Sequence, residues 1–382
     1  MPVTIGALRE VAAGETRVAL TPAVVAMLLR DGFGVVIETE AGDTAGFPDA
    51  DYAQAGARIA PREDVLTAHV VTCVGRPDAT VLKALAPGQV LAGFLDTWSE
   101  PDQLAALANR GVHVLSFDRL PRQISRAQTM DALSSQASLA GYRSAIVAAH
   151  EYGRYFPMMV TAAGTAKPAT VLVLGAGVAG LQAIATARRL GARVTGYDVR
   201  PAAREEVTSL GAAFLATTMD AVGEGGYARE LTAEESVAQR AELATAIANF
   251  DVVITTAKVP GRRPPELVSA ETVAVMRRGS VIVDLAASSL GGNVAGVVPD
   301  ATVTTPNGVV LIGAGEIAAQ MAPAASDAYA RNIAALISAL VNDGELAVDL
   351  TDEVVGAMAF AEASTEPAAQ PAPADSAAEV PA

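Results

Sequence analysis

Short apolar stretches alternate with longer stretches of helical periodicity along most of the chain. The first third predicts strands at Thr4–Leu8, Val35–Ile37, Val70–Cys73, Val90–Phe94 and His113–Leu115. Helical patterns lie between these strands, for example at Pro22–Arg30 and Pro101–Asn109. Further strands are expected at Val171–Leu174, Arg193–Tyr197, Asp251–Thr255, Ser280–Asp284, Thr302–Thr304 and Val309–Ile312. This alternation predicts an α/β fold with parallel sheets flanked by helices.

Two long helical stretches divide the chain into domains. The Ala-rich stretch Ser134–Tyr152 is long enough to connect two domains, and Ala325–Leu340 is expected to return to the first. We therefore predict two Rossmann-like domains joined by long helices, with a cleft between them. The first spans residues 1–133 and is completed by 322–355, and the second spans 134–321. Residues 356–382, rich in Ala and Pro from Glu362 onward, are expected to be a disordered tail.

A glycine-rich loop follows the strand Val171–Leu174. Gly175, Gly177 and Gly180 form the pattern G-x-G-x-x-G, and the next strand ends at Asp198. In a dinucleotide-binding βαβ unit these glycines permit a tight turn, close approach of the pyrophosphate, and close packing of helix on strand. The helix N-terminus then offers free N–H groups to the pyrophosphate. The segment predicts a binding site for NAD.

The acidic residue at the end of the second strand predicts which dinucleotide is preferred. Asp198 is placed to accept hydrogen bonds from the adenosine ribose, and its charge would repel the 2′-phosphate of NADP. Arg200 and Arg204 follow closely and weaken that preference. Further cofactor contacts are expected from loop and strand-end residues, namely Val178, Ala179, Val199, Arg200 and Ala257.

Composition excludes several classes of function. The net charge of −15 without a basic stripe argues against a polyanionic partner such as nucleic acid. Cys73 is the single cysteine, and the three histidines have no metal-ligand spacing, so we predict neither a disulfide framework nor a metal site. Neither a signal peptide nor an apolar run of about 18 residues is present, so a cytoplasmic protein without a membrane span is expected.

A second segment is dense in hydrogen-bonding groups. Between Leu120 and Gln136 the chain reads L-P-R-Q-I-S-R-A-Q-T-M-D-A-L-S-S-Q. One interpretation is an ordinary loop in which Asp131 or Ser134 caps the following helix. The other is a binding loop, and these residues by themselves do not decide between the two.

The run Arg122–Tyr142 resembles the NAD(H)-binding subunit of proton-translocating NAD(P) transhydrogenase. The resemblance extends from Val3 to about Leu340 and includes T-R-V-A-L-T-P from Thr16 and the glycine loop. It implies that Gln128 binds the nicotinamide carboxamide, that Asp131 holds an arginine, and that Ser134 is a further polar contact. Because Gln123 interrupts the family pattern P-R-I-S-R-A-Q, either Arg122 or Arg126 could be that arginine.

The resemblance also implies a mobile loop that closes over the nucleotide and contains Gly226 and Tyr227. It implies a homodimer, a separate NADP-binding subunit, and a membrane-spanning subunit that couples hydride transfer to proton movement. Peripheral attachment at the cytoplasmic face of the inner membrane, through these partners, is then expected.

Two alternative functions remain. Alanine dehydrogenase is a related family, but its lysine and histidine are missing from Thr72–Pro77 and Gly93–Trp98, and Asp284 is not followed by its second aspartate. The other alternative is a non-catalytic NAD-binding protein. A second glycine pattern, in Gly313–Gln320, matches a family cleft loop that usually contains Thr and Pro, so its role here is open.

Overall fold

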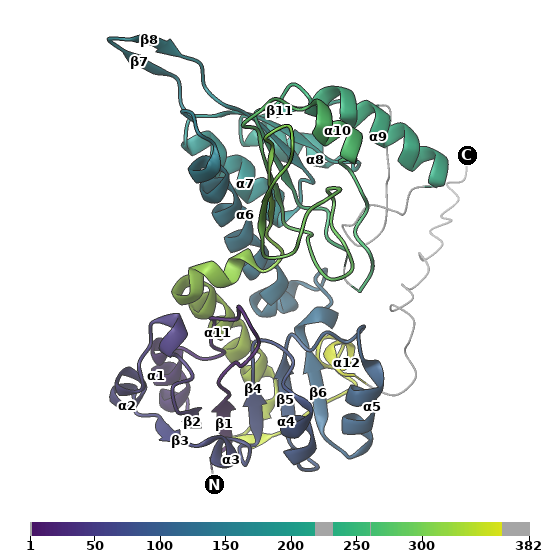
Figure 1. Cartoon of the computed structure of the whole chain (residues 1–382). Coiled ribbons are helices and arrows are strands. Elements are labelled where there is room, and N and C mark those ends of the chain that lie inside the picture. Colours follow the sequence, from purple (N-terminus) through teal and green to yellow (C-terminus); the bar gives the residue numbers. More distant parts are fainter. Residues whose placement is uncertain (1, 218–231, 260, 361–382) are drawn as a thin grey trace, which may run out of the picture.

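The computed structural model describes residues 2–217, 232–259 and 261–360, which form two α/β lobes (Figure 1). The predicted residues Gly226 and Tyr227, and the chain from 361 onward, lie outside the described residues.

The first lobe contains a parallel sheet whose described strands follow the order β3-β2-β1-β4-β5-β6. These strands are β1 (Thr4–Ala7), β2 (Gly34–Glu38), β3 (Arg58–Ala60), β4 (Val70–Thr72), β5 (Val90–Gly93) and β6 (His113–Ser116). The helices between them are α1 (Pro22–Arg30), α2 (Asp49–Ala55), α3 (Arg62–Val65), α4 (Ala79–Ala84) and α5 (Pro101–Asn109). The strand order reverses between β1 and β4, so loops diverge there at the carboxyl edge of the sheet.

The second lobe repeats this plan in the order β11-β10-β9-β12-β13-β15-β14. Its strands are β9 (Thr170–Leu174), β10 (Arg193–Tyr197), β11 (Ala213–Phe214), β12 (Val252–Thr255), β13 (Val281–Asp284), β14 (Thr302–Thr304) and β15 (Val310–Gly313). Its helices are α7 (Val178–Arg189), α8 (Ala203–Ser209), α9 (Ala233–Ile247) and α10 (Ala270–Val275). Strand β14 pairs antiparallel with β15, a departure from the parallel pattern at the sheet edge.

Two helices connect the lobes. Helix α6 (Ala132–Glu151) begins in the first lobe, where Ala132 joins the core, and ends in the second, where Ala145 and Ala148 are fully buried. The chain returns through the short 3₁₀ helix η4 (Ile317–Met321) and α11 (Ala322–Ala339). In Figure 1 α11 passes from the junction of the lobes onto the first sheet.

Two local features differ from the sequence expectations. Strands β7 (Met159–Thr161) and β8 (Gly164–Ala166) form an exposed hairpin that projects from the second lobe (Figure 1). The expected tail begins too early at 356, because helix α12 (Val355–Met358) packs into the first core with Met358 fully buried. A bridge between Leu115 and Ala359 extends this order to the edge of β6. Val354, Val355 and Met358 supply enough apolar surface to hold the segment.

Candidate functional site

The glycine loop forms the turn between β9 and α7. Gly175 has φ +99°, and a Cβ there would lie 2.4 Å from Oγ1 of Thr256. A Cβ on Gly180 would lie 1.8 Å from the carbonyl oxygen of Gly175, so only glycine lets the helix pack this closely. Around Gly177 a Cβ would meet nothing within 4 Å, and no side chain caps the helix that starts at Val178. The turn therefore leaves open space beside uncapped N–H groups.

Asp198, at the end of β10, closes this turn from the other side. Its Oδ2 accepts a hydrogen bond from the Ala176 N–H at 2.8 Å. The Arg200 guanidinium covers the same carboxylate, with Nε 3.0 Å from Oδ1 and Nη2 3.1 Å from Oδ2. These bonds to Asp198 raise the pKa of Arg200 above its usual value, against the effect of partial burial. Arg200 therefore compensates part of the negative charge at this position.

The other predicted contacts divide between the loop and the core. Ala179 directs its backbone against α6, because a Cβ on Gly141 would lie 2.0 Å from its carbonyl oxygen. Val178 is partly exposed at the helix start, whereas Val199 packs against the core of the second lobe. Of these three predicted cofactor contacts, Val178 is the most exposed.

The loop after β12 is held by a buried amide that the sequence did not single out. Asn293 is fully buried; its Oδ1 accepts from the Ala257 N–H at 3.0 Å and its Nδ2 donates to the Ala257 carbonyl at 3.1 Å. Asp284 in turn accepts the Asn293 backbone N–H at 2.7 Å. Burial raises the pKa of Asp284, although its hydrogen bonds act in the opposite direction. This relay fixes Ala257 beside the glycine loop.

A polar pocket of about 710 Å³ lies in the first lobe at the start of α6. Arg122 donates from Nε to Oδ2 of Asp131 at 3.1 Å and from Nη2 to Oγ of Ser134 at 2.9 Å. The Ser134 hydroxyl also donates to Asp131 at 2.6 Å. Asp131 caps α6 as well, by accepting the Ser134 N–H at 2.8 Å. Helix capping and the organisation of a polar pocket are thus performed by the same carboxylate.

The structure separates the two arginines between which the sequence left a choice. Arg126 lies away from this pocket and pairs with Asp352 and Glu353 of the C-terminal segment, so it is Arg122 that Asp131 holds. Gln128 lines the pocket and is exposed, and its side-chain amide makes no hydrogen bond to the other described residues.

Three pocket residues were not predicted as site residues: Gln123, Ser135 and Asn332. The Asn332 side chain accepts from the Ser135 hydroxyl at 2.8 Å and donates to the Thr129 carbonyl at 2.8 Å. Asn332 lies about 200 positions further along the chain on α11, so its contribution to the pocket depends on the return of that helix. A polar residue among the Ala, Ile and Leu residues of α11 was its only sequence signal.

Helix α6 sets the distance between the pocket and the glycine loop. Asp131 precedes the first turn of α6, and Gly141 packs against the first turn of α7. Ten residues of α-helix rise about 15 Å, so one extended ligand can reach from the glycine loop to the pocket. The open space at Gly177 and the uncapped start of α7 fit the pyrophosphate of a dinucleotide.

Comparison with known proteins agrees with this arrangement. Residues 6–140 match the model of the alanine dehydrogenase/PNT N-terminal domain, and residues 144–365 match that of the C-terminal domain. The chain belongs to the alanine dehydrogenase/PNT family. The sequence-based resemblance is thereby confirmed, as is the Rossmann-like α/β fold.

Within the family the chain is similar to transhydrogenases. It is 43% identical over 359 residues to NAD(P) transhydrogenase subunit alpha of Cereibacter sphaeroides, covering 92% of this chain and 68% of that one. A solved transhydrogenase from Sinorhizobium meliloti has a TM-score of 0.84 at 43% identity, covering 94% of this chain and 98% of that one. Alanine dehydrogenase of Mycolicibacterium smegmatis is 31% identical, over 74% of this chain and 72% of its own.

Among the residues that the structure describes, no helix is long and apolar enough to cross a membrane.

Proposed function

We propose that this chain is the NAD(H)-binding subunit of an NAD(P) transhydrogenase and aligns NADH for direct hydride transfer to NADP on a partner subunit. The observation that carries the proposal is the Arg122–Asp131–Ser134 network, which lies within reach of the glycine loop along α6. Family membership, and the identity of about 40% to curated alpha subunits, support the same activity.

The chemistry asks little of protein side chains beyond alignment. Bound NADH supplies a hydride, which leaves NAD⁺ behind and converts NADP⁺ to NADPH without release of a proton. The Gly175–Gly180 turn and Asp198 would hold the adenosine and pyrophosphate groups. Gln128, exposed in the pocket, would bind the nicotinamide carboxamide, and Arg122 is held in place by Asp131 and Ser134. A site of fixed hydrogen-bonding groups without a general base suits this reaction, because orientation provides most of the rate enhancement.

The proposed assembly includes subunits other than this chain. An NADP-binding subunit would dock over the pocket, and a membrane-spanning subunit would couple transfer to proton translocation and hold the complex at the membrane. We also propose that the chain forms a homodimer, which analytical ultracentrifugation of the purified protein tests directly.

The deciding experiment mixes the purified chain with a transhydrogenase NADP-binding component and follows NADH-driven reduction of NADP⁺. We expect transfer that requires both proteins, and a Gln128→Ala variant that loses transfer at least tenfold while binding NADH nearly as well. Lys167→Met, on the exposed segment after the β7–β8 hairpin, serves as a control.

Binding of both nucleotides without transfer would contradict the proposal and favour a non-catalytic NAD-binding protein. NADH oxidation that depends on pyruvate and ammonium would instead identify an alanine dehydrogenase.

A further inference from the structure

The second glycine pattern, Gly313–Gln320, is a packing element at the junction of the lobes. A Cβ on Gly313 would lie 1.9 Å from the carbonyl oxygen of Val298, and one on Gly315 would lie 2.0 Å from that of Ala287. Both glycines therefore serve close backbone approach within the second lobe, and neither opens a space for a phosphate. This segment runs from the last residue of β15 into η4, where the chain returns to the first lobe.

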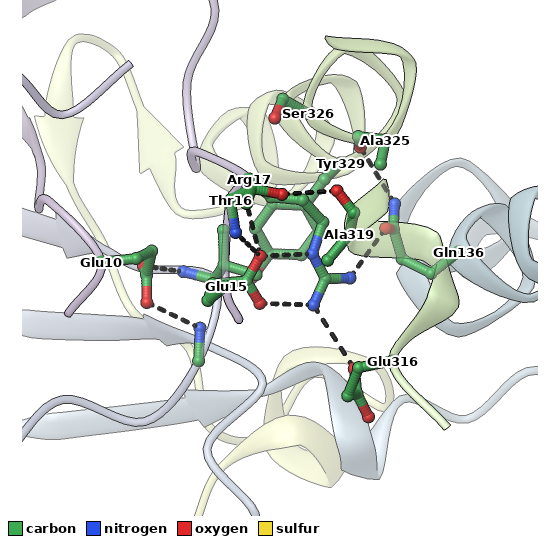
Figure 2. A network of polar contacts seen from close by, with 12 residues as sticks. Glu10, Glu15, Thr16, Arg17, Gln136, Glu316, Ala319, Ala325, Ser326 and Tyr329 are labelled. Atoms are coloured by element: carbon green, nitrogen blue, oxygen red, sulfur yellow. Dashed lines mark hydrogen bonds and ion pairs between the residues drawn. The ribbon is translucent and has the colours of Figure 1, made fainter. Parts of the chain in front are cut away.

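A buried arginine of the first lobe binds both connections between the lobes (Figure 2). Arg17 donates from Nη1 to Oε1 of Gln136 on α6 at 2.9 Å, and its Nη2 lies 3.6 Å from Oε2 of Glu316 in the Gly313–Gln320 loop. Glu15 holds the guanidinium in place through Nε at 2.8 Å and Nη2 at 2.6 Å. Burial tends to lower the pKa of Arg17, but Glu15 outweighs this effect and the pKa is raised. Arg17 is therefore a permanent cation at the junction.

Hydrogen bonds between side chains and backbone groups strengthen this junction on both sides of Arg17. The Thr16 hydroxyl donates to the carbonyl of Ala319 in η4, and the Val18 N–H donates to the Ser326 hydroxyl on α11 at 3.0 Å. The Gln136 amide donates to the Ala325 carbonyl at 3.0 Å, which ties α6 to α11. These contacts hold η4 and α11 on the first lobe, and Glu316 is the residue directly before η4.

Glu316 extends the junction to the nucleotide loop. Its Oε2 faces Arg17, while its Oε1 lies 3.4 Å from Nζ of Lys258. Lys258 follows Ala257, whose peptide groups are fixed by Asn293 beside the glycine loop. The Glu316 and Lys258 side chains are 63% and 53% exposed, so this pair can rearrange without exposing a buried charge.

We propose that Glu316 is a positioning residue that couples the loop after β12 to the orientation of the two lobes. One carboxylate bridges a fixed cation of the first lobe and a cation that moves with the nucleotide loop. When a dinucleotide displaces the loop, the displacement is transmitted through Glu316 to Arg17 and the connecting helices. This proposal takes one element from the proposed function, namely that the bound ligand is NAD(H).

The chain contains its own reporter of this coupling. Trp98 is the single tryptophan and is 39% exposed on the first lobe. A Cβ on Gly261, in the loop after β12, would lie 2.4 Å from Cγ of Trp98. The indole thus packs against the loop that Lys258 belongs to, but from the opposite lobe, and its accessibility measures how closely loop and lobe approach.

The experiment measures acrylamide quenching of Trp98 fluorescence with and without NAD⁺, in the full-length chain. We expect NAD⁺ to change the quenching constant of the unmodified protein and of the control variant Glu345→Gln, whose exposed carboxylate is remote on β17 (Glu345–Leu346). Glu316→Gln should lose at least half of that change while its dissociation constant for NAD⁺ stays within about threefold. Glu316→Asp should recover part of the NAD⁺-dependent change in the quenching constant. Lys258→Met should reduce this change as well, and the double variant with Glu316→Gln should lose less than the sum of the two single losses.

The outcomes are separable from those of the transfer assay. An NAD⁺-dependent change that persists in full in Glu316→Gln would overturn the inference, as would its absence from the unmodified protein. Additive effects of Glu316→Gln and Lys258→Met would overturn it as well. Failure of hydride transfer with a normal Trp98 response would contradict the proposed function alone. If the proposed function and the coupling through Glu316 are both correct, Glu316→Gln should slow hydride transfer by about two- to fivefold. This range corresponds to the free energy that an exposed ion pair contributes.

Discussion

At the scale of single residues, Glu10 shows how burial changes a carboxyl group. Its oxygens accept the backbone N–H groups of Val74 at 2.6 Å and Gly75 at 3.3 Å, at the carboxyl edge of the first sheet. Burial raises the pKa of Glu10 to about 7, although these hydrogen bonds act to lower it. The folded protein therefore holds a proton there that an unfolded chain releases nearer pH 4.5.

This difference predicts how stability depends on pH. Because the folded state binds more protons than the unfolded state between about pH 4.5 and 7, the free energy of unfolding falls as the pH rises through that window. A pKa shift of this size lowers the free energy of unfolding by up to about 3 kcal/mol above pH 7. Glu10→Gln should reduce the difference between the urea midpoints at pH 5 and pH 8. The surface substitution Glu63→Gln should leave this difference unchanged. An unchanged slope in Glu10→Gln would show that Glu10 titrates normally.

A second prediction at this scale concerns Asp198 and the relative affinity of the chain for NADH and NADPH. In the proposed site its carboxylate would repel a 2′-phosphate, while Arg200 compensates some of that charge. We expect NADH to bind more tightly than NADPH, and Asp198→Asn to narrow the ratio by about tenfold, equivalent to about 1.4 kcal/mol. An amide oxygen can still accept the Ala176 N–H, so the loop should be preserved. Equal affinities of the unmodified chain for NADH and NADPH, measured by calorimetry, would refute this interpretation.

At the scale of elements, the turn from β9 to α7 combines a glycine that close packing requires with a glycine that borders open space. Gly180 lies where a Cβ would overlap the Gly175 carbonyl, whereas Gly177 faces open space. The same sequence pattern thus contains one glycine that close packing requires and one that borders the open space where we propose that the pyrophosphate binds.

The two requirements can be distinguished by matched alanine variants. Gly180→Ala should destabilise the protein by about 1–3 kcal/mol, because an inserted methyl forces α7 away from the strand. Gly177→Ala should keep the thermal midpoint and weaken NADH binding, because its methyl occupies only the open space. Calorimetric melting and NADH titration of both variants provide the test. Loss of stability in Gly177→Ala, or normal binding by it, would contradict this division.

At the scale of the whole molecule, α11 joins the end of the chain to the first sheet. Tyr329 is fully buried in the first core, stacks with Phe94 at 5.4 Å, and donates its hydroxyl to the Cys73 carbonyl at 2.8 Å. The first lobe therefore completes its core with residues from beyond the second lobe. This placement agrees with the predicted completion of the first domain by 322–355, although the domain boundaries themselves stay predictions.

The energetic importance of this return can be measured at one position. Tyr329→Ala should lower the free energy of unfolding by about 3–5 kcal/mol, as expected for removal of a buried ring. Tyr329→Phe removes only the hydroxyl and should cost about 1 kcal/mol, or more if the Cys73 carbonyl is left unpaired. Urea denaturation of the two variants measures both values. A loss below about 1 kcal/mol in Tyr329→Ala would show that α11 is dispensable to the first lobe.

The sequence by itself determined the α/β class, the two Rossmann-like units, the family and the glycine-rich turn after β9. These follow from local signals, because strand and helix periods and the spacing of Gly175, Gly177 and Gly180 are set by neighbouring residues. The roles predicted for Gln128 and Asp198 stay predictions, and the loop with Gly226 and Tyr227 lies outside the described residues.

Only the tertiary structure decided which distant groups meet. It showed that Asp131 holds Arg122, whereas Arg126 pairs with Asp352. The residues around an arginine in a loop do not specify which distant carboxylate its side chain reaches. The tertiary structure also brought Asn293 to Ala257 and Glu316 to Arg17, pairs separated by 36 and by 299 positions along the chain. Such contacts depend on how two lobes and two connecting helices pack, which the local pattern of residues does not contain.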